Sequence, residues 1–314
     1  MSCPLVFACD AGYAPHLATA LRSAAESNRT AWPLECHVLS EGIPEPVQAR
    51  IHASLPAGSV TIRWTKVDLA PFRRFATMDH ITPVTYARLL LPELFAGTPR
   101  VLYLDADILV LGDLGPLREM DLGGAATGAV LDEMDGRIQA QPSRHAGIPR
   151  VRAYFNAGVL LIDLERWRTE GIAARALDYL AAHPDSPYSD QDALNVACEG
   201  RWLDLGPRWN YQHDDRLLGE LPEPPAIVHF VSREKPWRPA SLSRNAGFYD
   251  AFRSRTAFAR TRPERMRDGI AWGWHLSRRA WRYGLLRALR GRLARGTSRR
   301  EGGSAARTAG RPGL

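Results

Sequence analysis

The chain has 314 residues, of which 45% are hydrophobic and 24% are charged, as in an ordinary globular protein with one sizeable α/β domain or two small ones. No stretch approaches the roughly eighteen apolar residues of a transmembrane helix, and the N-terminus lacks the basic segment and long apolar run of a signal peptide. The net charge of +7 lies at the end of the chain, because residues 265–314 hold thirteen arginines against two acids, and residues 1–264 together carry −4. No nucleic-acid motif accompanies that charge, so we expect no nucleic-acid partner.

The chain opens with a strand, a loop and a helix. An apolar strand is predicted at Leu5–Ala8, and Pro15 starts a helix that runs to about Ser27 with its apolar residues on one face. This order is typical of a parallel α/β sheet, in which ligands bind at the carboxyl ends of the strands. Asp10 lies at such an end, where its carboxylate either accepts a hydrogen bond from a base or ribose or caps the loop.

The alternation continues, and its next elements are expected at Cys36–Leu39, Pro46–Leu55, Val60–Trp64 and Thr85–Leu91. The last of these, a helix, is predicted to end before Pro92, because the residue before a proline disfavours the helical conformation. Arg88 lies in that helix among apolar neighbours. Either its stem packs there and its charge reaches solvent, or it extends into an anionic site. The repeated alternation predicts an α/β fold.

The stretch VLYLDADILV at residues 101–110 is typical of a buried strand, except that Asp105 and Asp107 interrupt it. On an extended backbone, residues i and i+2 point to the same side, so both carboxylates can bind one object. Each buried ionised group loses several kcal/mol of hydration, and a hard divalent cation would compensate both. The alternative is that the pair caps a following helix or faces solvent at the end of the strand.

Polar residues also mark the next two strands. A strand is predicted at 123–131, with Asp132 at its end, and a polar excursion with two prolines follows at 135–150. A further strand is predicted in the stretch YFNAGVLLIDL at 154–164, with polar Asn156 near its start and Asp163 at its end.

Two helices are expected after that strand. The first spans Glu165–His183 and is broken by the proline that follows. The second has Ser189 as its N-cap and Asp190 and Asp192 in its first turn, which is a sufficient structural explanation for both acids. Capping leaves Gln191, which lies between them, unexplained.

A late strand is predicted at Ile227–Phe230, followed by VSREKPW at 231–237. His229 in that position is ordinarily a hydrogen-bonded structural residue. Ser232 and Lys235 also have the spacing of a serine acyl-enzyme motif. We reject that match, because the motif needs a helix and the proline directly after the lysine disfavours one.

Taken together, six stretches resemble glycosyltransferase family 8, the retaining sugar-nucleotide transferases, and within it the lipooligosaccharide α-galactosyltransferase type. They are VFACD, TYARLLLPELF, VLYLDADILV, YFNAGVLLIDL, SDQDALN and HFVSREKPW, in the family's order over about residues 5–240. Each is weak alone, whereas six with compatible spacing are specific. The resemblance implies a GT-A fold, a Rossmann-like sheet that binds a nucleotide sugar, in a catalytic domain over residues 1–262.

The resemblance also implies a role for each site residue. By motif position, the metal ligands would be Asp105, Asp107 and His229, the donor-binding residues Ala8, Asp10, Arg88, Asn156, Ser232 and Lys235, the catalytic residues Gln191 and Asp190, and the acceptor-binding residue Asp132. Two carboxylates and an imidazole suit Mn²⁺, with Mg²⁺ as the alternative ion. For the retaining step, a nucleophilic Asp190 and front-face attack with Gln191 beside the anomeric carbon both remain open.

Two positions depart from the family's pattern. The family usually has glycine at Ser232, where a backbone N–H approaches phosphate, and it has an acidic residue followed by asparagine where this chain has Ala11-Gly12. Neither change removes a metal ligand. The expected activity is therefore that of a metal-dependent retaining hexosyltransferase, which moves galactose or glucose from a UDP-sugar to a lipid-linked glycan or surface polysaccharide acceptor.

Two other functions were weighed. One is a catalytically weak nucleotide-sugar-binding or scaffold member of a glycan-assembly complex, which UDP release with and without Mn²⁺ would distinguish. The other is a phosphoryl-transfer enzyme with a nucleophilic Asp-x-Asp pair. That enzyme would need the pair after the first strand, and it leaves His229 and Lys235 without a role.

Residues 263–314 lie outside the resemblance. Trp281, Leu285, Leu289 and Leu293 recur every four residues among arginines, which is typical of a basic amphipathic helix on an anionic membrane surface. The alternative is a core-packed last helix followed by a disordered end. We expect a cytoplasmic protein that is peripheral on the inner face of the cell membrane.

Overall fold

The computed structural model describes residues 3–75, 82–213, 216–232, 235–238, 241, 243–261, 263–264, 266 and 270. Residues 1–237 and 242–260 form one compact unit, and residues 238–241 and 261–314 form a second. The amphipathic helix predicted for the tail lies outside the described residues. Among the described residues, no helix has both the length and the apolar character that a membrane span requires.

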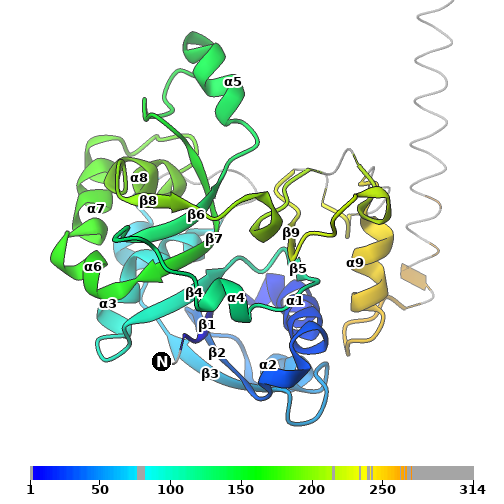
Figure 1. The fold of residues 1–314 in the computed structure, drawn as a ribbon. Coiled ribbons are helices and arrows are strands. Elements are labelled where there is room, and N and C mark those ends of the chain that lie inside the picture. The colour runs from blue at the N-terminus through cyan, green and yellow to red at the C-terminus, as the bar shows by residue number, and fades with distance from the viewer. Residues whose placement is uncertain are drawn as a thin grey trace, which may run out of the picture. The chain divides into compact units, whose positions relative to one another are not determined.

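The first unit is built on a seven-stranded, mostly parallel sheet in the order β3-β2-β1-β4-β7-β6-β8, as Figure 1 shows. The strands are β1 (Leu5–Ala8), β2 (Leu34–Ser40), β3 (Val60–Lys66), β4 (Arg100–Leu104), β6 (Thr127–Leu131), β7 (Phe155–Asp163) and β8 (Trp202–Asp204). The strands β1 to β4 run parallel to one another, whereas β7 is antiparallel to both β4 and β6. The α/β architecture predicted from the sequence is confirmed.

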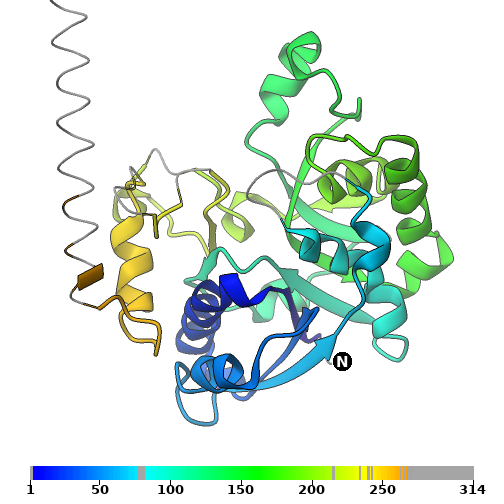
Figure 2. The ribbon, with the colours of Figure 1, turned by 180° about the vertical axis from the view of Figure 1, so that it is seen from behind.

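Helices cover both faces of the sheet. They are α1 (Ala14–Ser27), α2 (Glu45–His52), α3 (Leu91–Leu94), α4 (Gly115–Arg118), α5 (Asp135–Ala140), α6 (Leu164–Thr169), α7 (Ile172–Ala182), α8 (Asp190–Ala197) and α9 (Ala246–Arg253). Because successive strand residues point to opposite faces, Leu5 and Phe7 pack in one core with α1 and α2, and Val6 and Ala8 pack in another with α3 and α6 to α8. Figure 2 shows these two layers from behind. The strand β1 is thus buried on both faces.

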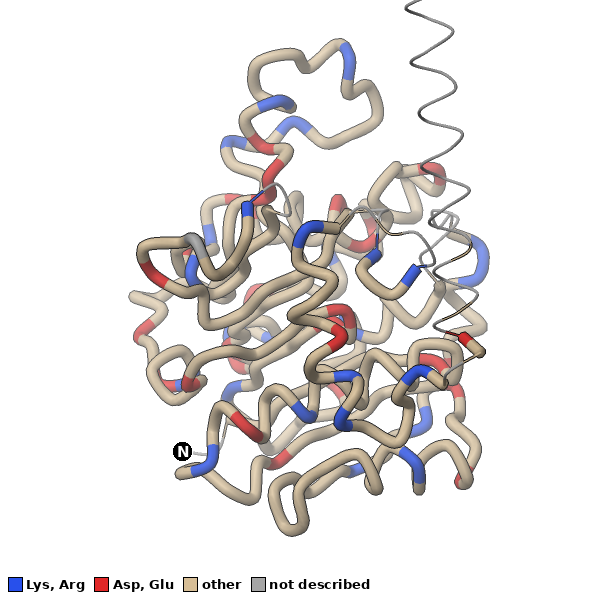
Figure 3. Tube along the Cα trace, turned by 90° about the vertical axis from the view of Figure 1, so that its right-hand side faces the viewer, with Lys and Arg blue, Asp and Glu red and all other residues tan. Residues whose placement is uncertain are grey.

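A smaller sheet pairs β5 (Ile108–Val110) with β9 (Ile227–His229) in antiparallel fashion. The excursion predicted at 135–150 contains α5 and a 3₁₀ helix at Pro142–His145, and it projects from the body in Figure 1. Figure 3 shows acidic and basic residues interspersed over the side of the body that it presents. The remaining 3₁₀ helices are Ala11–Tyr13, Arg29–Ala31, Ala70–Phe72, Pro83–Leu90, Pro207–Trp209 and Leu218–Glu220.

Two predicted helix boundaries are wrong, whereas the predicted N-cap position of α8, Ser189, is right. The helix expected to end before Pro92 is a 3₁₀ helix at Pro83–Leu90 that continues into α3, with Pro92 in the first turn. A proline is tolerated there because its missing N–H would have no intrahelical partner. The single helix expected at 165–183 is interrupted at Gly171, whose φ of 62° gives two helices, α6 and α7. Ser189 precedes α8 but forms no side-chain capping bond, and its φ is 53°.

Candidate active site

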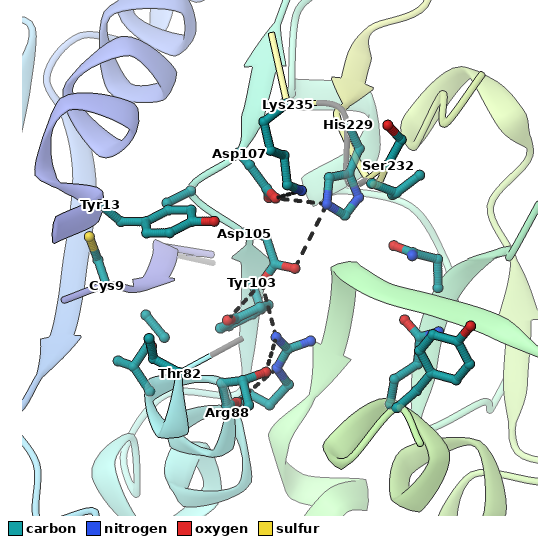
Figure 4. A pocket seen from close by; sticks show the side chains of 18 of the residues that line it. Cys9, Tyr13, Thr82, Arg88, Tyr103, Asp105, Asp107, His229, Ser232 and Lys235 are labelled. Atoms are coloured by element: carbon teal, nitrogen blue, oxygen red, sulfur yellow. Dashed lines mark hydrogen bonds and ion pairs between the residues drawn. The ribbon is translucent and has the colours of Figure 1, made fainter. Parts of the chain in front are cut away.

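The β5–β9 pair brings the predicted metal ligands together. Asp105 and Asp107 lie between β4 and β5, and the N–H of Asp105 donates to Gly158 O at 2.8 Å. The strand register places Ile108 opposite His229. His229 Nε2 is therefore 3.1 Å from Asp107 Oδ1 and 3.9 Å from Asp105 Oδ2. Among the described residues, these three side chains form a cluster whose ligand atoms lie within 4.8 Å of one another, and Figure 4 shows them converging.

Gly158 makes this convergence sterically possible. A Cβ atom at that position would lie 2.7 Å from Asp105 Oδ2 and would overlap the imidazole ring of His229. Real Cβ atoms do not come so close to other atoms. Position 158 therefore has to be glycine, because any side chain there would collide with Asp105 and His229. Sequence reasoning placed this glycine in a strand and missed its role.

Lys235 completes the charge balance beside Asp107. Its Nζ is 2.7 Å from Asp107 Oδ2 and donates to Phe230 O at 2.5 Å. Burial alone would raise the pKa of Asp107, but the ammonium of Lys235 and the contact with the His229 imidazole outweigh it and hold the pKa well below its usual range. Asp107 is therefore an anion at neutral pH, and its partners are a lysine and an imidazole in the same cavity.

Arg88 links the aspartate cluster to α8. Its guanidinium lies 3.0 Å from Asp105 Oδ1 and 2.9 Å from Asp190 Oδ2, and Nη1 donates to Ala157 O. Thr85 Oγ1 donates to Asp190 at 2.7 Å. Burial raises the pKa of Asp190 in spite of the arginine beside it. Of the two alternatives for Arg88, the structure shows the buried anionic contact.

Asp132 is the centre of a second polar group. Its Oδ2 accepts from Asn156 Nδ2 at 3.1 Å and from Gln191 Nε2 at 3.2 Å, and its Oδ1 accepts from the N–H of Met134. Gln191 Oε1 accepts from the N–H of Ala157 at 3.0 Å. The residues predicted to bind the donor (Asn156), to act in catalysis (Gln191) and to bind the acceptor (Asp132) are thus joined directly, and Gln191 is held at both ends of its amide.

Asp10 caps the turn after β1. Its Oδ1 accepts from the N–H of Tyr13 at 3.0 Å, and its Oδ2 accepts from the hydroxyl of Thr82 at 2.9 Å. The structural alternative for this residue is therefore observed. Its position beside Ala8 at the carboxyl end of β1 still agrees with a nucleoside site.

These groups surround a cavity of about 340 Å³, within the size range of small-ligand sites. The predicted residues that line it are Ala8, Asp10, Arg88, Asp105, Asp107, Asp132, Asn156, Gln191, His229, Ser232 and Lys235. Asp190 does not line the cavity, because it is buried behind Arg88 with 3% of its surface exposed. Lining residues that sequence reasoning missed include Tyr13, Thr82, Met134 and Tyr188, whose side chains follow no readable spacing.

Comparison with known proteins identifies the family. The family model for glycosyl transferase family 8 matches residues 4–240, which is well over half of the chain. The chain belongs to glycosyltransferase family 8. It is 31% identical over 251 residues to General stress protein A of Bacillus subtilis, covering 74% of this chain and 86% of that protein.

Other relatives of this family 8 protein have sugar-specific names. It is 26% identical over 218 residues to the lipopolysaccharide 1,3-galactosyltransferase of Salmonella typhimurium, covering 65% of this chain and 64% of that protein. A crystal structure of the galactosyltransferase LgtC with donor and acceptor sugar analogs has a TM-score of 0.72 and 31% identity, covering 84% of this chain and 99% of that one. The predicted family and the GT-A fold are confirmed.

Proposed function

We propose that this protein is a metal-dependent retaining glycosyltransferase. It moves galactose or glucose from a UDP-sugar to a lipid-linked glycan or a surface polysaccharide acceptor. The observation that carries the proposal is the convergence of Asp105, Asp107 and His229 with Lys235 in one cavity. The relatives named for lipopolysaccharide galactosyl transfer support the donor and acceptor classes.

The donor set fits a divalent cation. Two carboxylates and an imidazole offer oxygen and nitrogen ligands that suit Mn²⁺, with Mg²⁺ as the alternative. When bound, the ion would offset the negative charge that grows on the diphosphate leaving group. Arg88 and the hydroxyl of Tyr103, both 3.0 Å from Asp105 Oδ1, hold that carboxylate in place.

The donor nucleotide would bind beside this cluster. Ala8, through its backbone, and Asp10 lie at the end of β1 and would hold the uridine. Lys235 would leave Asp107 and bind the diphosphate, beside Ser232 in the same loop. Arg88, which contacts Asp105, would add positive charge to the site. Each of these groups stabilises the departing UDP.

Around the transferred sugar, Gln191 and Asp190 differ in access. Gln191 lines the cavity, whereas Asp190 is buried and paired with Arg88 at 2.9 Å. A nucleophilic Asp190 would have to leave that ion pair, so the arrangement favours front-face attack with Gln191 beside the anomeric carbon. Asn156 would bind the donor sugar, and Asp132 would accept a hydrogen bond from the acceptor.

The test is UDP release from a panel of UDP-glucose, UDP-galactose, UDP-N-acetylglucosamine and UDP-glucuronic acid, with and without Mn²⁺. We expect Mn²⁺-dependent release from the galactose or glucose donor. Binding of UDP without release from any of these donors would contradict the proposal and favour the scaffold function.

The tail, residues 263–314, would bring the catalytic domain to an anionic membrane surface on the cytoplasmic side. The proposal rests on the sequence pattern of residues 265–314, in which thirteen arginines accompany Trp281, Leu285, Leu289 and Leu293. Deleting residues 265–314 should leave UDP-sugar hydrolysis intact and abolish sedimentation with anionic vesicles. Equal sedimentation of both proteins, or no preference for anionic over neutral vesicles, would contradict the anchor.

A further inference from the structure

A buried asparagine outside all of the motifs contacts the imidazole of the metal cluster. Asn210 follows the 3₁₀ helix at Pro207–Trp209, and 1% of its surface is exposed. Its Nδ2 donates to Asn156 Oδ1 at 2.9 Å, and its Oδ1 lies 3.1 Å from His229 Nδ1. It therefore connects the sugar-site amides with a metal ligand.

The orientation of both amides follows from a backbone group that can only donate. The N–H of Gly158 donates to Asn156 Oδ1 at 3.0 Å, which fixes the oxygen side of that amide. Its nitrogen then faces Asp132 Oδ2, an acceptor, at 3.1 Å. Because Asn156 Oδ1 accepts, Asn210 must present its nitrogen to it. The oxygen of Asn210 consequently faces His229.

This chain of hydrogen bonds sets the tautomer of His229. An acceptor at Nδ1 requires the hydrogen to lie on Nδ1, and the lone pair of the neutral ring is then on Nε2. That lone pair points at Asp107 Oδ1, 3.1 Å away, with Asp105 Oδ2 at 3.9 Å. In this tautomer three electron-rich atoms face one another, and a divalent cation held by all three would offset their repulsion.

We propose that Asn210 is a positioning residue that holds His229 in the Nδ1–H tautomer, so that Nε2 is the metal ligand. The role rests on the proposed metal-dependent function, and it deepens that function. Asn210 is itself held by Asn156 and, through it, by Asp132, so the sugar site and the metal ligand share one hydrogen-bond relay. Hydrogen-bond partners of this kind fix the ring orientation of a metal-bound histidine.

The test uses a pair of substitutions in the full-length chain. Asn210→Leu removes the acceptor at similar volume, whereas Asn210→Asp keeps an oxygen for the Nδ1–H of His229. We expect the Kd for Mn²⁺, measured from the free-ion EPR signal, to rise about 10–100-fold in the leucine variant. The aspartate variant should recover part of that loss, because it keeps the acceptor for His229 but not the donor to Asn156. Thermal unfolding without metal checks that both variants are folded.

Gln212→Leu is the matched control. Gln212 is also a buried amide, but its side chain bonds to the backbone of Leu131, Glu133 and Asn210 and not to His229. Its Mn²⁺ affinity should stay at the wild-type value. Because Mg²⁺ prefers oxygen ligands, Asn210→Leu should also weaken Mg²⁺ binding less than Mn²⁺ binding, which a merely structural role would not produce.

The outcomes separate the two proposals. Wild-type Mn²⁺ affinity in Asn210→Leu, or an equal loss in Asn210→Leu and Gln212→Leu, would overturn the positioning role while leaving the metal site standing. Failure of the wild-type protein to bind Mn²⁺ would overturn the proposed metal-dependent function and the positioning role with it.

Discussion

Two carboxylates, the partly buried Asp107 and the fully buried Asp192, lie in very different surroundings. Asp107 is paired with Lys235 and His229, both of which carry or can carry positive charge. Asp192 accepts from the hydroxyl of Tyr154 at 2.5 Å, from Ser186 Oγ at 2.6 Å and from a backbone N–H at 2.8 Å. Burial raises the pKa of Asp192, and these neutral donors offset it only in part.

The difference separates a binding site from a support. The partners of Asp107 line an open cavity, so under the proposed function the carboxylate would bind a metal ion while Lys235 moves to the diphosphate. Asp192 is 0% exposed, and it joins α8 to the segment before β7 through Tyr154 and to the segment between α7 and α8 through Ser186. A carboxylate held by a lysine and an imidazole beside a cavity can take part in binding, whereas one held by hydroxyls and a backbone N–H in a closed core positions its neighbours.

The largest effect is expected from a substitution at Asp107, the carboxylate beside the open cavity. Asp107→Asn keeps the shape of the side chain but removes its charge, so Mn²⁺-dependent UDP release should fall more than about 100-fold, beyond the loss typical of outer-shell changes. Circular dichroism checks the fold, because Lys235 loses its partner charge. Asp192→Asn is the control and should retain activity within about tenfold. Near-normal turnover in Asp107→Asn would sink the metal-site assignment.

The next largest effect is expected from a substitution at Asp192, the carboxylate in the closed core. Asp192→Leu leaves the hydroxyls of Tyr154 and Ser186 and one backbone N–H without their acceptor. Each buried donor left unpaired costs about 1–3 kcal/mol of the free energy of unfolding. Urea denaturation should show that loss, with about 1 kcal/mol or less for Asp192→Asn. A leucine variant as stable as the wild type would mean that Asp192 is no support.

The pH dependence sharpens the same contrast. The pKa of Asp192 is raised from its ordinary value of 3.8, so the native state retains this proton in a range where the unfolded state has lost it. The contribution of Asp192 to stability is therefore greatest below pH 3.8 and declines as the pH rises through the folded-state pKa. Wild-type stability should fall relative to Asp192→Asn over that window in urea titrations. The opposite slope would show that Asp192 is stabilised as an anion.

The smallest effect concerns the turn directly before α8. Ser189 has a φ of 53°, and it is the residue other than glycine with positive φ among those described. Such a conformation costs on the order of 1–3 kcal/mol, and glycine adopts it freely. After loss of the serine hydroxyl contacts, Ser189→Gly should still raise the free energy of unfolding by about 1 kcal/mol. A loss of stability in thermal unfolding would show that the hydroxyl outweighs the backbone strain.

Some of this architecture could be predicted from the sequence because the signals are local. The strands β1 and β7 lie where their apolar runs are, since a run buried on both faces stands out. The direction of β7 could not be predicted, because an apolar run has the same composition whether its neighbours are parallel or antiparallel. The break at Gly171 was also missed, since a single glycine within a helical pattern is compatible with continuation.

Some residues of the site could likewise be predicted from local sequence signals, and others could not. Asp105 and Asp107 could be singled out because two acids interrupt an apolar strand, and His229 because its segment follows the family pattern. Asn210 has no such signal, because its proposed positioning role depends on contacts with Asn156 and His229, which are 54 and 19 positions away in the sequence. The burial of Asp190 behind Arg88 likewise depends on how the 3₁₀ helix before α3 meets α8, which no spacing encodes.

The most direct test of the central claim is a crystal of the full-length protein grown with UDP and Mn²⁺, with data collected for the anomalous signal of manganese. The account predicts one anomalous peak bound by Asp105, Asp107 and His229 Nε2, with Lys235 moved from Asp107 to the diphosphate. UDP bound in the cavity without a manganese peak, and with Lys235 still on Asp107, would contradict it.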